Sequence, residues 1–112
     1  MPQGAQSDAL RRFKADVFLA LGHPTRIFIL ECLGDGEKPV SVLIERIGIE
    51  PANLSQHLAV LRAKRLVTNR KDGHQVFYAL RDPLLIELLD VARRYFQGHL
   101  EEALAMLKEM EL

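Results

Sequence analysis

The sequence of 112 residues is short of the features that mark secreted, membrane-spanning and disulfide-linked proteins. Its one cysteine, Cys32, cannot form an intrachain disulfide. The longest aliphatic run lies near Ile27–Leu30, far below the roughly 20 residues that a transmembrane helix needs. The N-terminal stretch MPQGAQSD has neither the basic nor the apolar region of a secretory signal. We therefore expect a cytoplasmic protein with no membrane segment, whose residues 1–112 form a single domain.

Sequence motifs of catalysis are also missing. No glycine-rich phosphate loop, nucleophile elbow or HExxH helix occurs in the chain. Glu31, Asp35 and Glu37 lie too close together in the sequence to face each other across a cleft as an acid–base pair. The sequence predicts neither an enzyme nor a bound cofactor.

The net charge of zero hides an uneven distribution of charge along the chain. Between residues 53 and 81, six basic residues accompany one acidic residue, Asp72, so this segment carries +5 and the remainder −5. Such a run can be a solvated face, but beside the helix and hairpin patterns described below it favours nucleic-acid binding. The basic residues are Arg62, Lys64, Arg65, Arg70, Lys71 and Arg81.

Two helices are predicted before the basic segment. One spans about Ser7–Leu21, and the next runs from Pro24 to about Leu33, just before the glycines of Gly34-Asp35-Gly36. Proline suits the first position of a helix because its missing N–H would be unpaired there. The second helix has almost no polar side, which predicts that it is the most buried helix of the fold.

The segment from Ser41 to Lys64 has the pattern of a helix-turn-helix. A short helix is expected to begin near Ser41, a good N-cap, and to end at Gly48, where glycine readily adopts a positive φ. A second helix opens at Pro51 and runs to about Lys64. Two short helices joined by a tight turn that contains glycine form a helix-turn-helix.

The second helix of this pair has an unusual outer face. Leu54, Leu58 and Leu61 form a core-facing stripe, whereas the other side carries small or uncharged side chains instead of Lys and Glu. A thin, uncharged face suits close approach to DNA bases, and a glutamine amide can bond adenine N6 and N7 together. The outer residues are Ala52, Asn53, Ser55, Gln56, Ala59 and Ala63.

The stretch LVTNRKDGHQVFYAL predicts a basic β-hairpin directly after this helix. Val76, Tyr78 and Leu80 alternate with their neighbours at the period of a half-buried strand. Asp72-Gly73 indicates a two-residue turn of type I′, which needs a positive φ at both positions. The expected fold is mainly α: a winged helix-turn-helix with about five helices and a two-stranded wing.

From Asp82 onward the chain predicts one long helix or two, since Gly98 could bend or split it. Asp82 is the expected cap and Pro83 the opening residue. A single helix would extend roughly 40 Å at 1.5 Å per residue, longer than so small a core needs. Its surplus apolar stripe, with that of the first helix, predicts a homodimer interface that includes Leu10, Phe13, Val17, Leu89, Tyr95 and Phe96.

Three stretches of the chain resemble the ArsR/SmtB family of winged-helix repressors: LGHPTRIFIL, SVLIERIGIEPANLSQHLAVLRAKRLV and RKDGHQVFYAL. The resemblance runs from about Phe13 to Phe96. It implies a homodimer that binds double-stranded operator DNA, at an inverted repeat, and releases it when an inducer binds. In this family the inducer is most often a metal or metalloid ion, and in other members a change in cysteine redox state.

The sequence departs from the metal-sensing members of that family. Their cysteine cluster is reduced here to Cys32, and a site for a soft ion needs two or more sulfurs. Leu84 and Tyr95 stand near the positions of their histidine ligands, and the His99–Glu102 pair supplies only two ligands. We therefore expect no metal site. Cys32 is either an inert core residue or the one candidate for redox sensing, and the inducer stays unassigned.

Arg65 stands where the resemblance leads us to expect the glycine that ends the recognition helix. If this residue has a positive φ, an arginine there costs about 1 kcal/mol of strain. It would also add a cation beside the DNA backbone.

The resemblance and the residue patterns together predict DNA contacts on the recognition helix and the wing. Gln56, with Asn53 and Ser55 beside it, is expected to reach base edges, while the basic residues hold phosphates. His57 could contact DNA or bond locally at the edge of the leucine stripe. The predicted DNA-binding residues are Asn53, Ser55, Gln56, His57, Arg62, Lys64, Arg70, Lys71 and His74. The alternative is a winged-helix dimer that binds other proteins and no DNA.

Overall fold

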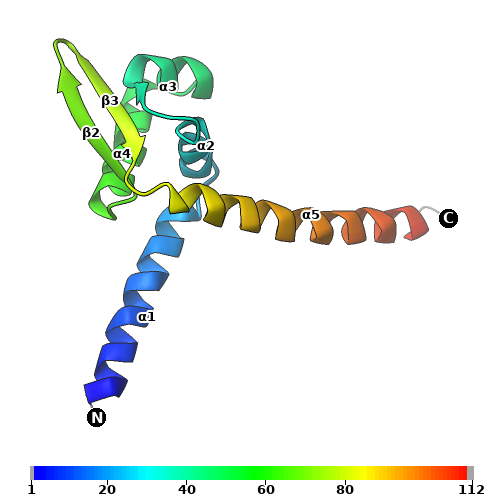
Figure 1. Ribbon diagram of the computed structural model, residues 1–112. Helices are drawn as coiled ribbons and strands as arrows, with labels where there is room; N and C mark the ends of the chain where they lie inside the picture. The colour runs from blue at the N-terminus through cyan, green and yellow to red at the C-terminus, as the bar shows by residue number, and fades with distance from the viewer. Residues whose placement is uncertain (1, 111–112) are drawn as a thin grey trace. The chain divides into compact units, whose positions relative to one another are not determined.

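A computed structural model describes residues 2–110, and within that range it contains five α-helices and three β-strands (Figure 1). The chain divides into two compact units, one ending at Asp82 and the other beginning at Pro83. The first unit holds α1 to α4 and the whole sheet, and the second holds α5 alone. The helices are α1 (Pro2–Leu21), α2 (Pro24–Cys32), α3 (Val40–Ile47), α4 (Pro51–Ala63) and α5 (Leu84–Met110).

The core of the first unit forms where α2, α3 and α4 meet. The predicted leucine stripe of α4 is confirmed, because Leu54, Leu58 and Leu61 are all buried. From α2, Ile29 and Leu30 are completely buried beside them. The prediction that α2 is the most buried helix is confirmed, because three of its nine residues, Ile29, Leu30 and Cys32, are buried, although Ile27 and Phe28 remain partly exposed. A nine-residue helix covered by neighbours on one side only leaves its other side without a packing layer.

The turn of the helix-turn-helix follows the sequence pattern, except at the start of α3. Gly48 has φ 72°, as predicted, and its N–H donates to the Ile44 carbonyl at 2.9 Å. The prediction that Ser41 caps α3 is wrong, because the N-cap is Pro39 and no side chain bonds to the free amides there. Residues 38 and 39 are held extended as strand β1 (Lys38–Pro39), so the helix begins directly after the strand.

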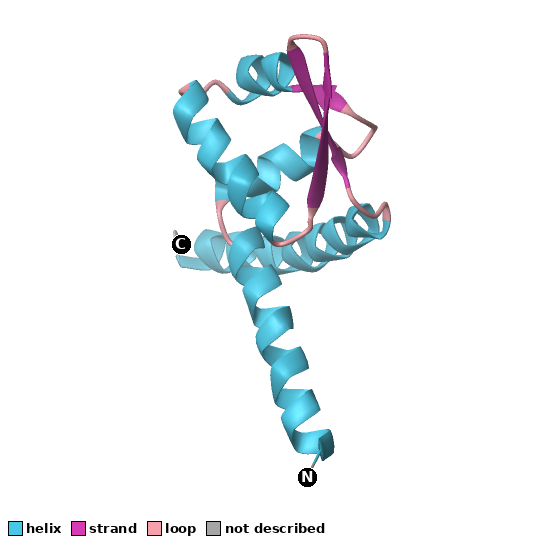
Figure 2. Ribbon diagram, turned by 90° about the vertical axis from the view of Figure 1, so that its left-hand side faces the viewer, coloured by secondary structure: helices cyan, strands magenta, loops and turns pink. Residues whose placement is uncertain are grey.

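The wing is an antiparallel hairpin of β2 (Val67–Asp72) and β3 (Gln75–Leu80), which confirms the predicted fold class (Figure 2). A third strand, β1, pairs with the other edge of β3, giving the order β1-β3-β2. Two residues are too few to show an alternating pattern, so the sequence did not reveal this strand.

The predicted wing turn is wrong in position by one residue and therefore also in type. Asp72 pairs with Gln75, so the two loop residues are Gly73 and His74 rather than Asp72 and Gly73. Of these two, only Gly73 has a positive φ, 63°. A turn with positive φ at its first central residue alone requires glycine there and not at the second position.

The C-terminal segment is one continuous helix. Helix α5 passes through Gly98 without a break, and its 27 residues extend about 40 Å. At the other end of the chain, α1 begins at Pro2 and is therefore longer than the predicted Ser7–Leu21. No helix in the described range 2–110 is long and apolar enough to cross a membrane.

Helix α4 ends on a strained residue, as the sequence suggested. Within residues 2–110, Arg65 is the only residue besides glycine with a positive φ, 58°. The Leu66 N–H donates to the Leu61 carbonyl at 2.9 Å, and the Arg65 N–H donates to the Arg62 carbonyl at 3.0 Å. These two bonds form a Schellman motif, in which the residue with positive φ is usually glycine.

We expect Arg65→Gly to raise the free energy of unfolding by about 1 kcal/mol, because glycine removes the clash between Cβ and backbone. Urea denaturation followed by circular dichroism measures this difference. The matched control is Arg65→Ala, which also removes the charge but keeps the Cβ, and which should give no such gain. An equal gain in both variants would attribute the effect to the lost charge and contradict the strain argument.

Candidate nucleic-acid interface

Helix α4 turns a polar face outward because its leucines fix its rotation in the core. Leu54 and Leu58 are buried, and the predicted base-reading residues between and beside them are all exposed. These exposed residues are Asn53, Ser55 and Gln56. They lie in the N-terminal half of the helix, the half that recognition helices use for base contacts.

A groove of about 390 Å³ separates α4 from the wing. Ser55 of α4 lines one side, and His74 and Gln75 at the tip of the wing line another. Ser41, from the uncapped start of α3, completes the polar lining. The sequence predicted Ser41 as a cap and gave no signal for Gln75, which only the return of the hairpin brings beside Ser55.

The two faces of the wing separate Lys71 from Arg70. Residues directly opposite each other in an antiparallel pair project from the same face of the sheet. Lys71 is opposite Val76, which lines the groove, whereas Arg70 is opposite Phe77. The Lys71 side chain therefore projects from the face of the sheet that borders the groove, and the Arg70 side chain projects from the outer face.

On that outer face the guanidinium of Arg70 already has a hydrogen-bond partner, Glu37. Its Nε and Nη2 donate to the two carboxylate oxygens of Glu37 at 2.8 and 2.6 Å, and its guanidinium lies 4.5 Å from the centre of the Phe77 ring. The Arg70 hydrogen bond holds the pKa of Glu37 below its usual range, and the same bond raises the pKa of Arg70. Glu37 offered no signal in the sequence, since it lies in a loop far from the basic segment.

Arg62 and Lys64 lie at the opposite end of α4 from the groove. Between Asn53 and Lys64 the helix axis rises about 16 Å at 1.5 Å per residue. Lys64 Nζ lies 3.6 Å from a carboxylate oxygen of Asp16 on α1. Of the predicted DNA-binding residues, Ser55 and His74 line the groove. Asn53 and Gln56 are exposed beside Ser55 on α4, and Lys71 projects from the same strand face as Val76.

His57 faces α2 rather than the groove. Its ring centre lies 4.4 Å from that of His23, and its Nδ1 lies 3.4 Å from Nη1 of Arg26. His23 Nδ1 in turn accepts the Thr25 N–H and caps α2. Burial, followed by the nearby charges of His23 and Arg26, lowers the pKa of His57. Of the two readings of His57, the contacts support local bonding at the helix boundary.

The residues considered for sensing are dispersed. Cys32 is only 6% exposed, so a reaction at its thiol requires α2 to open locally. His99 and Glu102 pair with each other at 3.9 Å on the surface of α5. Over the described range, no group of three or more His, Cys, Asp or Glu side chains is arranged to hold a metal ion.

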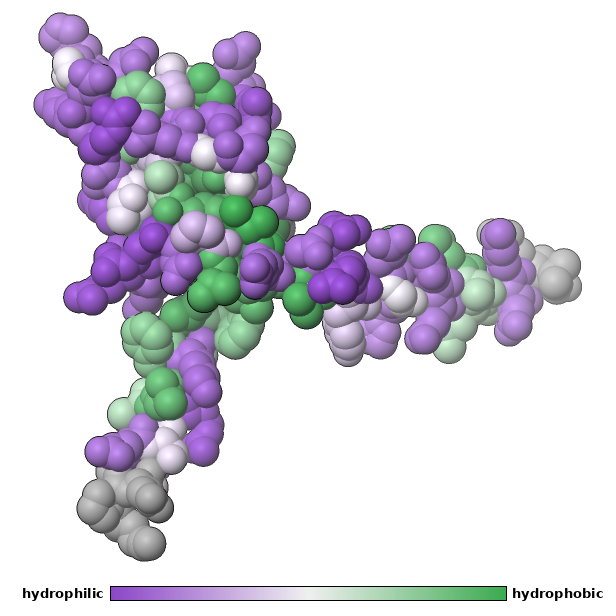
Figure 3. Space-filling model, in the orientation of Figure 1, coloured by the Kyte–Doolittle hydropathy of each residue, from purple (hydrophilic) through white to green (hydrophobic). Residues whose placement is uncertain are grey.

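Helices α1 and α5 each carry an apolar face that is open to solvent (Figure 3). Of the predicted interface residues, Leu10, Phe13, Tyr95 and Phe96 are exposed, Phe96 by 62%. Val17 and Leu89 are half-buried. On α5 the exposed apolar residues continue at helical spacing to the end of the helix, as Leu100, Leu104 and Leu107.

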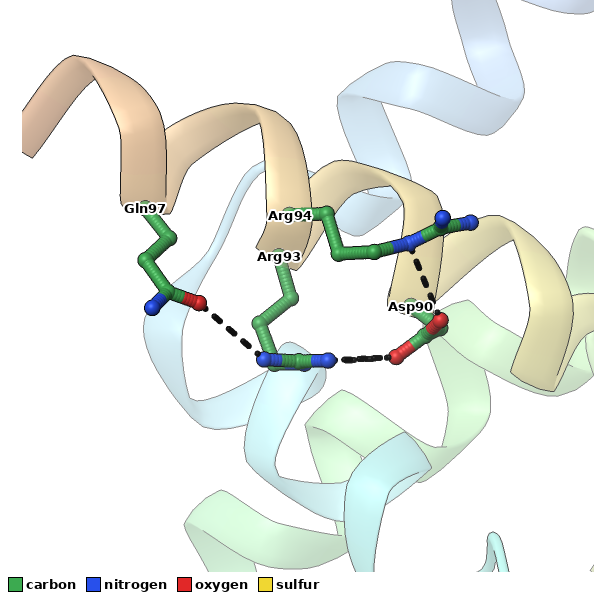
Figure 4. Close-up of polar contacts among 4 residues, drawn as sticks. All are labelled: Asp90, Arg93, Arg94 and Gln97. Carbon is green, nitrogen blue, oxygen red and sulfur yellow. Dashed lines mark hydrogen bonds and ion pairs between the residues drawn. The ribbon is translucent and has the colours of Figure 1, made fainter.

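On the polar side of α5, Asp90 forms ion pairs with Arg93 and Arg94, and Arg93 also donates a hydrogen bond to Gln97 (Figure 4). Arg93 donates to Asp90 at 2.9 Å and to Gln97 at 3.3 Å. Arg94 pairs with the same carboxylate at 3.3 Å, and the Arg93 hydrogen bond lowers the pKa of Asp90. The helix is therefore amphipathic along its length, which is the pattern of a helix that packs on a partner.

Comparison with known proteins places this arrangement in a family. Residues 21–70 match the model of a helix-turn-helix domain. The HTH-type transcriptional regulator Rv0081 of Mycobacterium tuberculosis is 39% identical over 106 residues, which cover 94% of this chain and 93% of that protein. Its crystal structure has a TM-score of 0.79 and 40% identity, covering 85% of this chain and 96% of that chain.

Two further solved structures have the same fold. The homodimeric winged helix-turn-helix DNA-binding domain of Mb0332 from Mycobacterium bovis, a candidate ArsR-family regulator, has a TM-score of 0.79 at 27% identity. The match covers 87% of this chain and 90% of that chain. The transcriptional repressor BigR from Xylella fastidiosa has a TM-score of 0.71 at 30% identity, covering 86% and 96%.

The chain belongs to the ArsR/SmtB family. This confirms the resemblance carried by the three sequence stretches. The ArsR-family chain is a winged-helix transcriptional regulator that binds DNA, and its relatives are named as regulators rather than as enzymes. The alternative of an adaptor that binds only proteins is not favoured.

The lowered pKa of His57 predicts a stability that depends on pH in this ArsR-family chain. Because the folded pKa lies below the unfolded value of about 6.5, the unfolded state takes up its proton first as the pH falls. The free energy of unfolding should therefore be level above about pH 7.5 and should decline as the pH falls through about 6.5. Urea denaturation at a series of pH values between these limits and about 5.5 measures the decline.

Two variants assign that decline to His57. His57→Gln keeps a polar side chain beside Arg26 but cannot titrate, so its stability should vary much less over this range. His74→Gln, in the exposed turn of the wing, is the matched control and should keep the full decline. If His57→Gln declines as steeply as the unmodified protein, the histidine pair does not cause the dependence.

Proposed function

We propose that the protein is a homodimeric repressor that binds operator DNA through α4 and the wing and leaves it in response to an inducer. The groove between Ser55 and the wing tip is the single observation that supports this most strongly. It sets the uncharged outer face of α4 beside the tip of the wing, and Lys71 projects from the strand face that borders it, as binding to base edges and to the adjoining phosphates requires.

In this arrangement α4 enters the major groove with its N-terminal half. Gln56 is long enough to bond adenine N6 and N7, and Asn53 and Ser55 flank it on the exposed side. The alanines of the outer face keep that side thin, so the backbone approaches the base edges closely. Lys71 and His74 then hold phosphates from the wing, which lies over the neighbouring minor groove.

The dimer supplies the second half-site. The apolar faces of α1 and α5 are the surfaces proposed to join two copies, because each helix leaves a row of large apolar side chains in water, which single chains rarely do. Two recognition helices related by a two-fold axis read an inverted repeat with half-sites about 10 base pairs apart, or a multiple of that spacing.

Base reading and phosphate binding should separate under mutation. We expect Gln56→Ala to weaken operator binding by about 1–3 kcal/mol and random DNA far less, and to relax the preference at one base pair. Lys71→Ala should weaken both DNAs alike and reduce the salt dependence by about one unit of slope. Fluorescence anisotropy with a fragment of the protein's own promoter and a random fragment of equal length, at several salt concentrations, measures both.

Lys64→Ala is the matched control, since it removes the same charge at the far end of α4. It should change the slope much less than Lys71→Ala. Equal effects of the two lysines would contradict the position assigned to the groove. Equal loss on operator and random DNA in Gln56→Ala would show that Gln56 reads no base.

The homodimer is tested through α5. Phe96→Asp places a charge in the proposed interface and should shift the protein from dimer to monomer in sedimentation equilibrium at micromolar concentration. Gln97→Asp introduces the same charge on the polar side of the helix and should leave the dimer intact. An unmodified protein that sediments as a monomer would refute the interface.

A further inference from the structure

We propose that Glu37 and Arg70 form a clamp across the outer face of the sheet, and that Arg70 positions the wing for DNA instead of binding a phosphate. Glu37 is the other positioning residue. This inference rests on the proposed DNA-binding function and concerns how the wing is held in it.

The clamp spans all three strands. Glu37 directly precedes β1, and Arg70 lies on β2, while β3 runs between these two edge strands. Adjacent strands lie about 4.8 Å apart, so the pair bridges roughly 9.6 Å over the central strand. Phe77 of β3 lies under the guanidinium, at 4.5 Å from its ring centre, and supports the arginine from below.

The position of the wing depends on few other contacts at this edge. Strand β1 has only two residues, and one of them, Pro39, has no N–H to donate to β3. The buried side chains of Val67 and Tyr78 hold the base of the hairpin, and its exposed outer part depends on side-chain links such as this clamp. Lys38 strengthens the same loop through a 2.7 Å ion pair with Asp35.

Two observations argue that Arg70 does not bind phosphate. Its Nε and Nη2 edge, which would clasp a phosphate with two parallel bonds, is taken by both oxygens of Glu37. Its side chain also projects from the outer face, whereas Lys71 projects from the face that borders the groove. A phosphate could use this edge of the guanidinium only by displacing a bidentate carboxylate, and on the other edge Nη1 lies 3.7 Å from a carboxylate oxygen of Asp72.

A charge swap tests the clamp. Arg70→Glu or Glu37→Arg alone places two like charges together and should weaken operator binding about tenfold, whereas the double variant should return to within about threefold of the unmodified protein. The double variant has the same net charge as the unmodified protein. The probe is the fragment of the protein's own promoter, followed by fluorescence anisotropy.

The matched control is a double variant that combines Glu37→Arg with Lys71→Glu. It has the same net charge as the Glu37→Arg, Arg70→Glu double variant, but the negative charge that it introduces lies on the other face of the sheet. This combination should show no rescue. In a second measurement, Arg70→Ala should leave the salt slope unchanged, unlike a variant that loses a phosphate contact. The free energy of unfolding should also change little, since the clamp is partly in solvent and such pairs contribute little to stability.

Either of two results would overturn the inference: a double variant as weak as Arg70→Glu, or a slope reduced by about one unit in Arg70→Ala. If a reversal fails to fold by circular dichroism, Glu37→Gln and Arg70→Gln replace it. Because both substitutions break the same contact, their losses of operator affinity should not add in the double variant. Additive losses would also overturn the inference. Failure of the proposed function differs from all of these, because the unmodified protein would then bind no promoter DNA.

Discussion

The burial of three leucines on one side of α4 is the constraint on which the interface depends. Leu54, Leu58 and Leu61 are buried where α4 packs on α2 and β2, and their burial fixes the rotation of the helix about its axis. Because side chains at these spacings share one face, Ser55, Gln56 and Ala59 point the other way, while His57 lies at the edge of the stripe and faces α2. The polar, uncharged face of the helix is therefore presented to the outside by packing, without any contact of its own.

The strand alternation of the wing imposes a second constraint of the same kind. Val67 is buried at the base of β2, so every second residue after it shares that face, and Lys71 is one of them. Arg70 must project from the opposite side, where Glu37 and Phe77 receive it. The neighbouring residues Arg70 and Lys71 thus have different surroundings. Glu37 neutralises the charge of Arg70, so the basic segment presents less positive charge at the outer face of the sheet than its count of basic residues suggests.

The histidine and arginine contacts at the start of α2 connect the recognition helix to the rest of its unit. His23 caps α2 and packs on His57 of α4, while Arg26 donates to carbonyls at the end of α1. Three helices therefore meet at one cluster of groups that carry or can carry positive charge. The lowered pKa of His57 keeps one member of this cluster uncharged at neutral pH, which limits the repulsion from Arg26.

The sequence alone determined what depends on local periodicity and backbone geometry. It specified the leucine stripe, the glycine turn before Pro51 and the hairpin, since each is set by residues a few positions apart. The family resemblance marked Arg65 as the position where a positive φ would carry strain. Only the tertiary structure decided the third strand, the shift of the wing turn and the separation of Lys64 from the groove. It alone paired Arg70 with Glu37, because the return of the chain that brings such distant residues together leaves no periodic signal.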